Sequence, residues 1–140
     1  MTRQEFEVKL IEDLVRGIDY PYLYIRDNKE ILRRNKDDFR GYFLNNPGHA
    51  YYYSLWIDEC PRDDTRESVC KNPMHAYHYA LSVDKCSRND TRKVACKDPY
   101  SAYYYAIYVD KGHHKDTFNA VKDTEWEEDY LYYAWEVHNE

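Results

Sequence analysis

Residues 46–71 read NPGHAYYYSLWIDECPRDDTRESVCK, residues 72–97 read NPMHAYHYALSVDKCSRNDTRKVACK, and residues 98–123 read DPYSAYYYAIYVDKGHHKDTFNAVKD. The three segments align without gaps at a period of 26 residues. Identical residues fix the alignment at three places, namely Pro47, Pro73 and Pro99, Ala50, Ala76 and Ala102, and Asp64, Asp90 and Asp116. A period of this length is typical of stacked supersecondary units. The sequence therefore predicts a repeat architecture.

Each repeat is expected to form two short helices. Asn or Asp is a strong helix N-cap, and proline is favoured at the first helical position, so the Asn-Pro and Asp-Pro pairs mark helix starts. The first helix should run about 12 residues and end near Asp58, Asp84 and Asp110. The second should begin at Asp64, Asp90 and Asp116 and stop before the next proline. We interpret both sets of aspartates as structural caps.

The first helix of each repeat has one apolar or small face. Positions i, i+3, i+4 and i+7 carry Ala50, Tyr53, Ser54 and Ile57, then Ala76, Tyr79, Ala80 and Val83, then Ala102, Tyr105, Ala106 and Val109. This spacing is helical and does not show the alternation of a strand. The fold class is therefore predicted to be all-α, a short right-stacked solenoid of helical hairpins with a 26-residue repeat.

The two ends should cap this row within a single domain over 1–140. Residues 1–45 are assigned to N-terminal cap helices, in which Thr2 and Glu5 form a capping box and Gly17 ends the first helix. An apolar stripe of this amphipathic helix is expected to face inward through Phe6, Leu10, Ile11, Leu14 and Val15. Residues 28–44 should add one or two helices. Residues 124–140 should close the other end with an acidic helix over about 125–138.

Charge is concentrated at the C-terminal end. Residues 123–140 carry seven carboxylates and no Lys or Arg, whereas the first 122 residues hold 20 basic and 19 acidic groups. A balanced body does not favour nucleic-acid binding. A basic cluster is interleaved with acids and is interpreted as a solvated helix face, with a phosphate-binding patch as the alternative: Lys29, Arg33, Arg34, Lys36 and Arg40. No apolar run approaches the roughly 20 residues of a membrane span, so no membrane partner is expected.

The motif Asp98-Pro99-x-x-Ala102-Tyr103-x-Tyr105-Ala106 resembles tyrosine-rich helical repeats of bacteriophage and giant-virus proteins. It is also similar to bacterial repeat families of unknown function. The resemblance covers residues 46–137 and implies stacked helical hairpins. A viral origin would imply a small accessory protein that binds and blocks a host defence protein in the host cytoplasm.

An outward band of aromatic side chains is the candidate partner-binding surface. It consists of His49, Tyr52, Trp56, His75, His78, Tyr104 and Tyr108. These positions stay aromatic where a solvated face would carry Lys or Glu, and exposed Tyr and Trp commonly mark interfaces. The alternative is that a neighbouring helix covers them. Self-association through the same band is also left open.

Cysteines and histidines give weaker signals. Cys60, Cys70, Cys86 and Cys96 follow the repeat, and equivalent positions on stacked helices lie too far apart for disulfides, so we expect free thiols in small buried slots. His49, His75 and His78 could converge on a transition metal, but no matching carboxylate or cysteine shares their face. We therefore predict no metal site and no cofactor.

Catalytic motifs are absent from the sequence, which has no phosphate-binding glycine loop and no Gly-x-Ser-x-Gly or His-Glu-x-x-His motif. We therefore expect no enzyme and no catalytic residues. The function predicted is a non-enzymatic, cytoplasmic protein-binding module, a virus-encoded inhibitor or modulator of a host protein. One alternative is an acidic nucleic-acid mimic or a nucleic-acid-associated protein, and the other is a metal- or small-ligand-binding protein that uses the histidine face.

Overall fold

The computed structural model describes residues 1–136 of the chain, with side chains described through Trp135. Every regular element in this part is helical, and none of residues 1–136 forms a strand. The predicted all-α fold class is therefore confirmed. The last two residues of the final helix, expected at 137 and 138, lie outside the described part.

Five short elements precede the repeated segments. These are α1 (Arg3–Arg16), α2 (Pro21–Asp27), α3 (Lys29–Arg34), α4 (Lys36–Phe39) and the 3₁₀ turn η1 (Arg40–Phe43). The hydroxyl of Thr2 caps α1 by accepting from the Glu5 amide at 3.1 Å, as predicted. Gly17 follows α1 with φ of 98°, a conformation that favours glycine. The side chain of Tyr24 ties α2 to α1 by donating to Asp13 at 2.9 Å.

The predicted inward stripe of α1 is only half correct. Phe6 and Leu10 are buried against α2–α4, but Ile11 is 42% exposed and Val15 is 84% exposed. Their directions differ because, at about 100° per residue, Ile11 and Val15 lie on the opposite side of the helix from Phe6. α1 therefore has an inner apolar face and a separate outer one.

Three helix pairs follow. The first helices are α5 (Pro47–Tyr53), α7 (Pro73–Tyr79) and α9 (Pro99–Tyr104), and each continues into a wider π-helical turn, η2 (Ser54–Asp58), η3 (Ala80–Asp84) and η4 (Tyr105–Asp110). The second helices are α6 (Asp63–Val69), α8 (Asn89–Ala95) and α10 (Lys115–Val121). The chain then forms α11 (Glu127–Tyr130) and η5 (Leu131–Glu136). The helix starts and ends predicted from Asn-Pro and Asp-Pro lie within one or two residues of these bounds.

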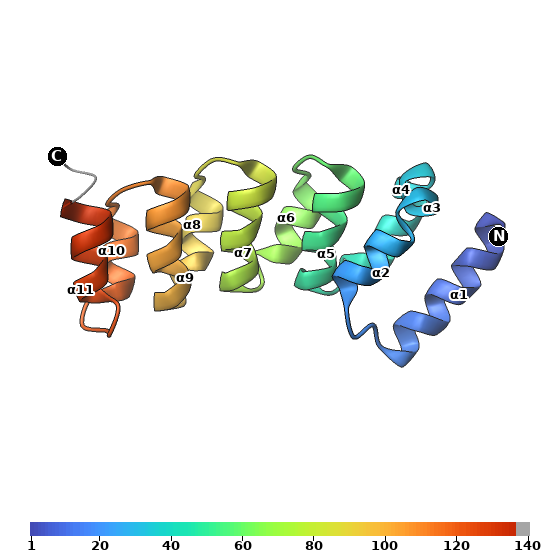
Figure 1. The fold of residues 1–140 in the computed structure, drawn as a ribbon, viewed down its shortest axis with the longest axis horizontal. Coiled ribbons are helices and arrows are strands. Elements are labelled where there is room, and N and C mark those ends of the chain that lie inside the picture. Colours follow the sequence, from blue (N-terminus) through green and yellow to red (C-terminus); the bar gives the residue numbers. More distant parts are fainter. Residues whose placement is uncertain (137–140) are drawn as a thin grey trace.

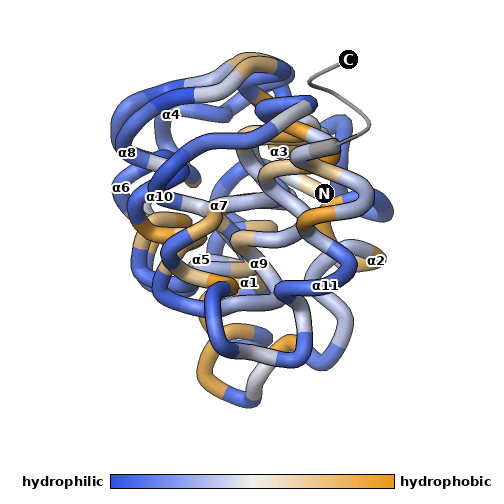
Figure 2. The backbone as a smooth tube through the Cα atoms, turned by 90° about the vertical axis from the view of Figure 1, so that its left-hand side faces the viewer, coloured by the Kyte–Doolittle hydropathy of each residue, from blue (hydrophilic) through white to orange (hydrophobic). Residues whose placement is uncertain are grey.

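The helix pairs stand side by side in a row (Figure 1), with α5, α7 and α9 in one layer and α6, α8 and α10 in the other. Viewed along the row in Figure 2, α6, α8 and α10 lie on one side, where the tube is mostly hydrophilic. α1 lies at the N-terminal end of the row and diverges from its neighbours. Buried side chains form four clusters along the row, and the predicted faces of α5 and α7 are all buried.

Capping accounts for both ends of the first helices. The side chains of Asn46, Asn72 and Asp98 accept from backbone amides of the first turn, and a proline follows each. After each π-helical turn the chain leaves through a left-handed residue, with φ of 56° at Glu59, 58° at Lys85 and 57° at Lys111. A left-handed residue of this kind ends a helix because the following residues can no longer continue its hydrogen bonding.

The assignment of the aspartates as caps is wrong. Asp84 does not cap its helix but binds Arg66 of the preceding helix pair, and Asp110 binds Arg92 in the same way. Arg40 likewise binds Asp58 at 2.8 Å and Asp64 at 2.7 Å. The N-cap residues of α6, α8 and α10 are Arg62, Arg88 and His114. Asp64 and Asp90 lie inside the first turn, where each accepts from the backbone amide of the next residue at 2.7 Å. Each arginine thus joins one helix pair to the next.

A buried tyrosine accompanies each of these arginines. The Tyr105 hydroxyl lies 2.8 Å from the Thr91 hydroxyl, accepts from the Arg88 amide at 3.0 Å and donates to the Arg88 carbonyl at 3.1 Å. The Arg92 guanidinium lies over the Tyr105 ring, 5.7 Å from its centre. Tyr79 makes the corresponding contacts one helix pair earlier. These tyrosines satisfy the backbone at the start of the preceding second helix.

At the last helix pair, a contact between aromatic rings takes the place of the arginine–aspartate ion pair. Phe118 stands on α10 where α8 has Arg92, and its ring packs at 5.2 Å against Trp135. Tyr130 takes the tyrosine position, with its hydroxyl 2.8 Å from that of Thr117. By these contacts Tyr130 is the counterpart of Tyr105.

Candidate functional site

One face of the first helices carries a continuous series of aromatic rings, which we call the aromatic belt. It begins on α2, crosses α5, α7 and α9, and ends just before α11. Its members are Tyr22, Tyr51, Tyr52, Trp56, His75, Tyr77, His78, Tyr100, Tyr103, Tyr104, Tyr108 and Trp126.

Contacts between ring centres connect the whole belt. Tyr22 of α2 meets Tyr52 at 5.5 Å, and Tyr52 meets its neighbour Tyr51 at 5.1 Å. Tyr51 then contacts His78 of α7 at 6.0 Å. Separations of 4.5–7 Å in tilted or edge-on geometry are those that aromatic pairs prefer. The rings of successive helices therefore hold one another in place.

The second half of the belt continues toward the C-terminal end. His78 lies 4.8 Å from Tyr77, which contacts Tyr104 of α9 at 6.3 Å. Tyr104 stacks nearly parallel on Tyr108, with an interplanar angle of 7° at 5.8 Å. Tyr100 bridges to Trp126 at 5.2 Å. The most accessible ring of the belt is Tyr108, which is 51% exposed.

Six of the seven predicted band residues lie in the belt, and His49 does not. His49 lies instead against Phe43 of η1, with ring centres 6.3 Å apart. Tyr52 and Trp56 are half-buried because Tyr22 packs on both. The band is therefore partly covered at its N-terminal end by α2 and opens toward α9.

Sequence reasoning missed half of the belt. Tyr51 and Tyr77 link successive first helices, and Tyr103 links α9 to Trp126, although each of the three is at most 9% exposed. The available signal was that tyrosine occupies this position in all three repeats, directly after an alanine. Tyr22, Tyr100 and Trp126 had no such signal, because they come from outside the matching columns or vary within them.

Burial favours the neutral form of several side chains in the belt. It raises the pKa of Tyr77 and of Tyr103 to about 12, so both phenols stay protonated. It also lowers the pKa of His75 and of His78 below 6.5, with a further contribution at His78 from the neighbouring His75. The belt thus offers rings, hydroxyls and neutral imidazoles rather than charges.

All four cysteines are free thiols in the structure, but only two are sheltered. Cys60 and Cys86 are exposed, so the predicted buried slots are wrong for them; Cys70 and Cys96 are half-buried. Burial raises the pKa of the Cys96 thiol to about 11. A thiol of that kind is nearly unreactive at neutral pH.

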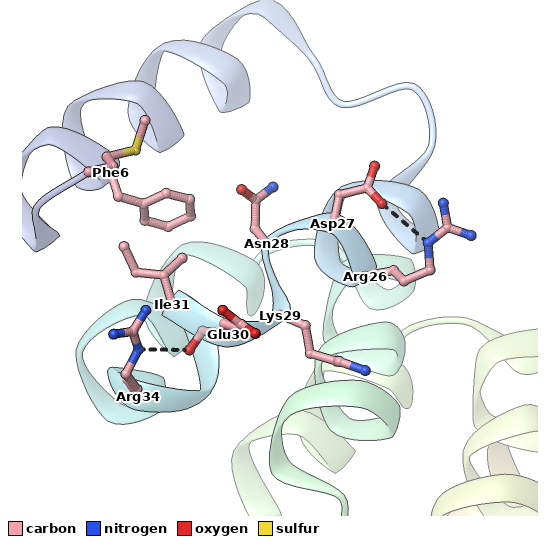
Figure 3. A pocket seen from close by; sticks show the side chains of 9 residues that line it. Phe6, Arg26, Asp27, Asn28, Lys29, Glu30, Ile31 and Arg34 are labelled. Carbon is pink, nitrogen blue, oxygen red and sulfur yellow. Dashed lines mark hydrogen bonds and ion pairs between the residues drawn. The ribbon is translucent and has the colours of Figure 1, made fainter.

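The basic cluster of residues 29–40 is divided among different contacts. Arg40 is buried in its two ion pairs, while Arg33 donates to the Trp56 carbonyl at 3.0 Å and also binds Glu59. A pocket of about 490 Å³ lies beside the remainder, between α1 and α3, with Phe6 and Ile31 on its apolar side (Figure 3). Its charges are of both signs and partly paired within the wall, as Arg26 is to Asp27 at 3.2 Å. The cluster does not form a continuous cationic patch.

Within the part of the chain that the structure describes, no three His, Cys, Asp or Glu side chains gather closely enough to hold a metal ion. No helix among residues 1–136 is long and apolar enough to cross a membrane.

The chain matches no protein-family model, no curated protein and no solved structure. No relative therefore bears on the resemblance to viral tyrosine-rich repeats, which stays a prediction.

Proposed function

We propose that this chain is a non-enzymatic protein-binding module that docks a partner protein on the aromatic belt. The observation that carries the proposal is the continuity of the belt, in which rings from α2, α5, α7 and α9 form one connected surface. A helix face that only contacts water would be expected to carry Lys or Glu rather than so many tyrosines.

Physical chemistry supports tyrosine and tryptophan as contact residues. Each buries a large area while losing few rotamers, so the entropic cost of docking is small. The rings of the belt already restrain one another, which lowers that cost further. Since the belt is uncharged, we expect a partner surface that is apolar with hydrogen-bonding groups, and an affinity that changes little with salt.

The architecture proposed for this module is a short right-stacked solenoid with a 26-residue repeat. Its support is that α2, α5, α7 and α9 start at Pro21, Pro47, Pro73 and Pro99, each 26 residues after the last. The interlocking arginines Arg40, Arg66 and Arg92 have the same spacing. Residues 20–45 would then be a divergent first hairpin, and residues 1–19 the cap.

The partner we propose is a host protein that the chain inhibits or modulates in the cytoplasm. This part rests on the resemblance to viral repeats alone. A host partner can be distinguished by experiment, because it must be captured from a lysate of the host and not only from a lysate of the source organism.

Affinity capture with paired variants tests the proposal. Tyr108→Ala removes a ring of the belt that is 51% exposed, and Tyr133→Ala removes one outside the belt that is 49% exposed. We expect a protein that the wild type and Tyr133→Ala retain and that Tyr108→Ala combined with Tyr104→Ala releases. Binding of the purified partner should then vary less than about twofold between 50 and 500 mM salt. Equal retention by all variants would overturn the belt as the docking surface.

An acidic nucleic-acid mimic is the second candidate, favoured by one observation. Glu125, Glu128 and Asp129 are exposed together at the C-terminal end, beside residue Asp123, which is also exposed. A partner that normally binds nucleic acid would recognise them electrostatically. Its binding would weaken steeply with salt and would be lost in Glu128→Gln with Asp129→Asn rather than in the belt variants.

A further inference from the structure

We propose that the outer face of α1 binds α1 of a second copy of this chain, antiparallel and about a two-fold axis. The face consists of Val8, Ile11 and Val15, which are 59%, 42% and 84% exposed. Phe6 and Leu10 already occupy the inner face in the core. The outer residues therefore are not needed to hold α1 on the fold.

Their spacing is that of a helix–helix seam. Val8, Ile11 and Val15 follow one another at intervals of three and four residues. Apolar residues at these intervals form the stripe along which two helices pack in a coiled coil. At 1.5 Å per residue, the 14 residues of α1 provide a seam about 21 Å long.

Charges beside the seam specify the partner. Glu5, Lys9, Glu12 and Arg16 lie along one edge of it, and their signs alternate along the helix. If a second α1 runs antiparallel, Glu5 meets Arg16 of that copy and Lys9 meets its Glu12. In a parallel pair about a two-fold axis this edge would lie against the other edge of the second helix, so these four charges would not meet one another. When the same helix is turned end to end, each charge in this order therefore faces one of opposite sign. A surface that is complementary to a second copy of itself is what an isologous two-fold interface requires.

One register satisfies both the apolar and the charged residues. Reversal about a point close to Ile11 brings Val8 opposite Val15 of the second copy and Ile11 opposite itself. The same reversal produces the four ion pairs. Lys9 and Arg16 now contact Asp13 at 3.8 Å and 2.7 Å, and their side chains are still 48% and 74% exposed. They can therefore turn toward the second copy, while Asp13, whose side chain is 15% exposed, keeps its hydrogen bond from Tyr24 at 2.9 Å.

The position of α1 makes this contact compatible with partner binding. α1 lies at the N-terminal end of the row, and no residue of the aromatic belt lies on it (Figure 1). A dimer through α1 would carry two belts, so a partner with two sites would be held more tightly through avidity. Dimerisation itself does not depend on the proposed function of the belt.

A seam of one short helix puts the dimer in the weak class. Interfaces below about 1,200 Å² are transient, so we expect dissociation on the order of 100 μM. Sedimentation equilibrium from 10 μM to 1 mM should show a monomer–dimer equilibrium for the wild type. Ile11→Ser should weaken it at least tenfold, because it removes the residue nearest the axis.

Charge reversal tests the antiparallel order directly. Lys9→Glu with Arg16→Glu makes the edge wholly acidic, and Glu5→Lys with Glu12→Lys makes it wholly basic. Each double variant alone should be monomeric at 1 mM, and an equimolar mixture of the two should dimerise at least as tightly as the wild type. Recovery in the mixture also shows that both variants are folded.

Three results would overturn the proposal. The first is a wild type that stays monomeric at 1 mM. The second is a dimer that survives Ile11→Ser but is lost in Leu131→Ser, a matched change of a 37% exposed residue at the opposite end. The third is wild-type monomer that binds vesicles of phosphatidylcholine and phosphatidylserine through Ile11, which would assign the face to a lipid surface.

Discussion

Arg92 of α8 donates two hydrogen bonds to the carboxylate of Asp110 at the end of η4, from Nε at 3.0 Å and from Nη2 at 2.6 Å. The two side chains are only 9% and 7% exposed. They belong to consecutive helix pairs, so the ion pair fixes the position of one pair on the next. The Tyr105 ring lies over one face of the Arg92 guanidinium. The pair is thus shielded from water by the core that it helps to align.

Asp110→Ala should lower the free energy of unfolding by about 3–5 kcal/mol, because it leaves the Arg92 guanidinium buried without its counter-charge. Urea unfolding followed by far-ultraviolet circular dichroism measures the change. The replacement of both residues, Arg92→Met with Asp110→Leu, should cost much less than Asp110→Ala alone, since no unpaired charge remains.

The neighbouring exposed pair supplies the control. Arg88 and Asp90 lie 3.1 Å apart with side chains 45% and 44% exposed. Arg88→Ala should leave the urea midpoint close to that of the wild type, because an exposed ion pair contributes little to stability. Equal losses for Arg88→Ala and Asp110→Ala would mean that the buried pair does not determine the fit between helix pairs.

Tyr105→Phe should destabilise the fold by about 1–3 kcal/mol, although it removes a single oxygen. That oxygen lies 2.8 Å from the Thr91 hydroxyl and bonds both backbone groups of Arg88. Its loss leaves the buried start of α8 unsatisfied. Tyr108→Phe, on the exposed end of the same helix, should cost less than about 0.5 kcal/mol. Comparable costs for the two variants would contradict the role assigned to the buried hydroxyl.

The helix boundaries were predictable from the sequence because local chemistry sets them. Asn46 followed by Pro47 begins a helix through capping and a fixed φ, and neither effect depends on distant residues. The inward face of α7 was likewise readable from the spacing of Ala76, Tyr79 and Ala80, all of which are fully buried. Positions that carry similar residues in every repeat thus indicate which side chains are buried in the core.

Contacts between helix pairs were not predictable in the same way. Asp84 recurs like a cap, but its partner is Arg66, on another helix 18 residues earlier. The recurrence of arginine at 40, 66 and 92 was visible in the sequence and would have pointed to this partner. The alignment of the three repeats did not include it, because Arg40 lies before residue 46 and the third repeat has Phe118 at this position.

The candidate site was predictable only in part, for a geometrical reason. Tyr52 and Tyr104 were chosen as outward residues, but on a helix packed on three sides even an outward ring touches its neighbours. Tyr51 and Tyr77 complete the belt from positions that are buried. In a row of closely packed helices, a side chain can therefore be largely buried and still form part of a continuous aromatic surface.

Lys85→Gly should stabilise the protein by about 0.5–1 kcal/mol. Lys85 has φ of 58°, a left-handed conformation that glycine adopts without steric cost. Lys93 lies exposed within α8 and makes the matched control, since Lys93→Gly should destabilise by about 1 kcal/mol. Thermal unfolding of both variants checks that the two changes in stability have opposite signs. A loss of stability in Lys85→Gly would show that the lysine side chain contributes more than its backbone strain costs.

Acidification should destabilise the protein through His75 and His78. Burial lowers the pKa of both imidazoles in the folded state below the 6.5 of an exposed histidine. His75 lies against Gly48 and Tyr51, and His78 lies between Tyr51 and Tyr77, so neither has an acidic neighbour among these contacts. The unfolded chain therefore takes up protons first as the pH falls through 6.5.

The consequence has a definite sign. Stability should be complete above pH 7 and should fall from about pH 6.5 downward until the folded-state pKa is reached, with a slope of at most about 1.4 kcal/mol per pH unit for each histidine. Urea midpoints at pH 7.5, 6.5 and 5.5 measure it. His75→Gln with His78→Gln should make the dependence shallower, because glutamine does not titrate; the part that remains comes from His49 and His113, whose pKa values burial also lowers. A wild type that is equally stable at pH 7.5 and 5.5 would mean that the two imidazoles are as accessible to protons in the fold as in the unfolded chain.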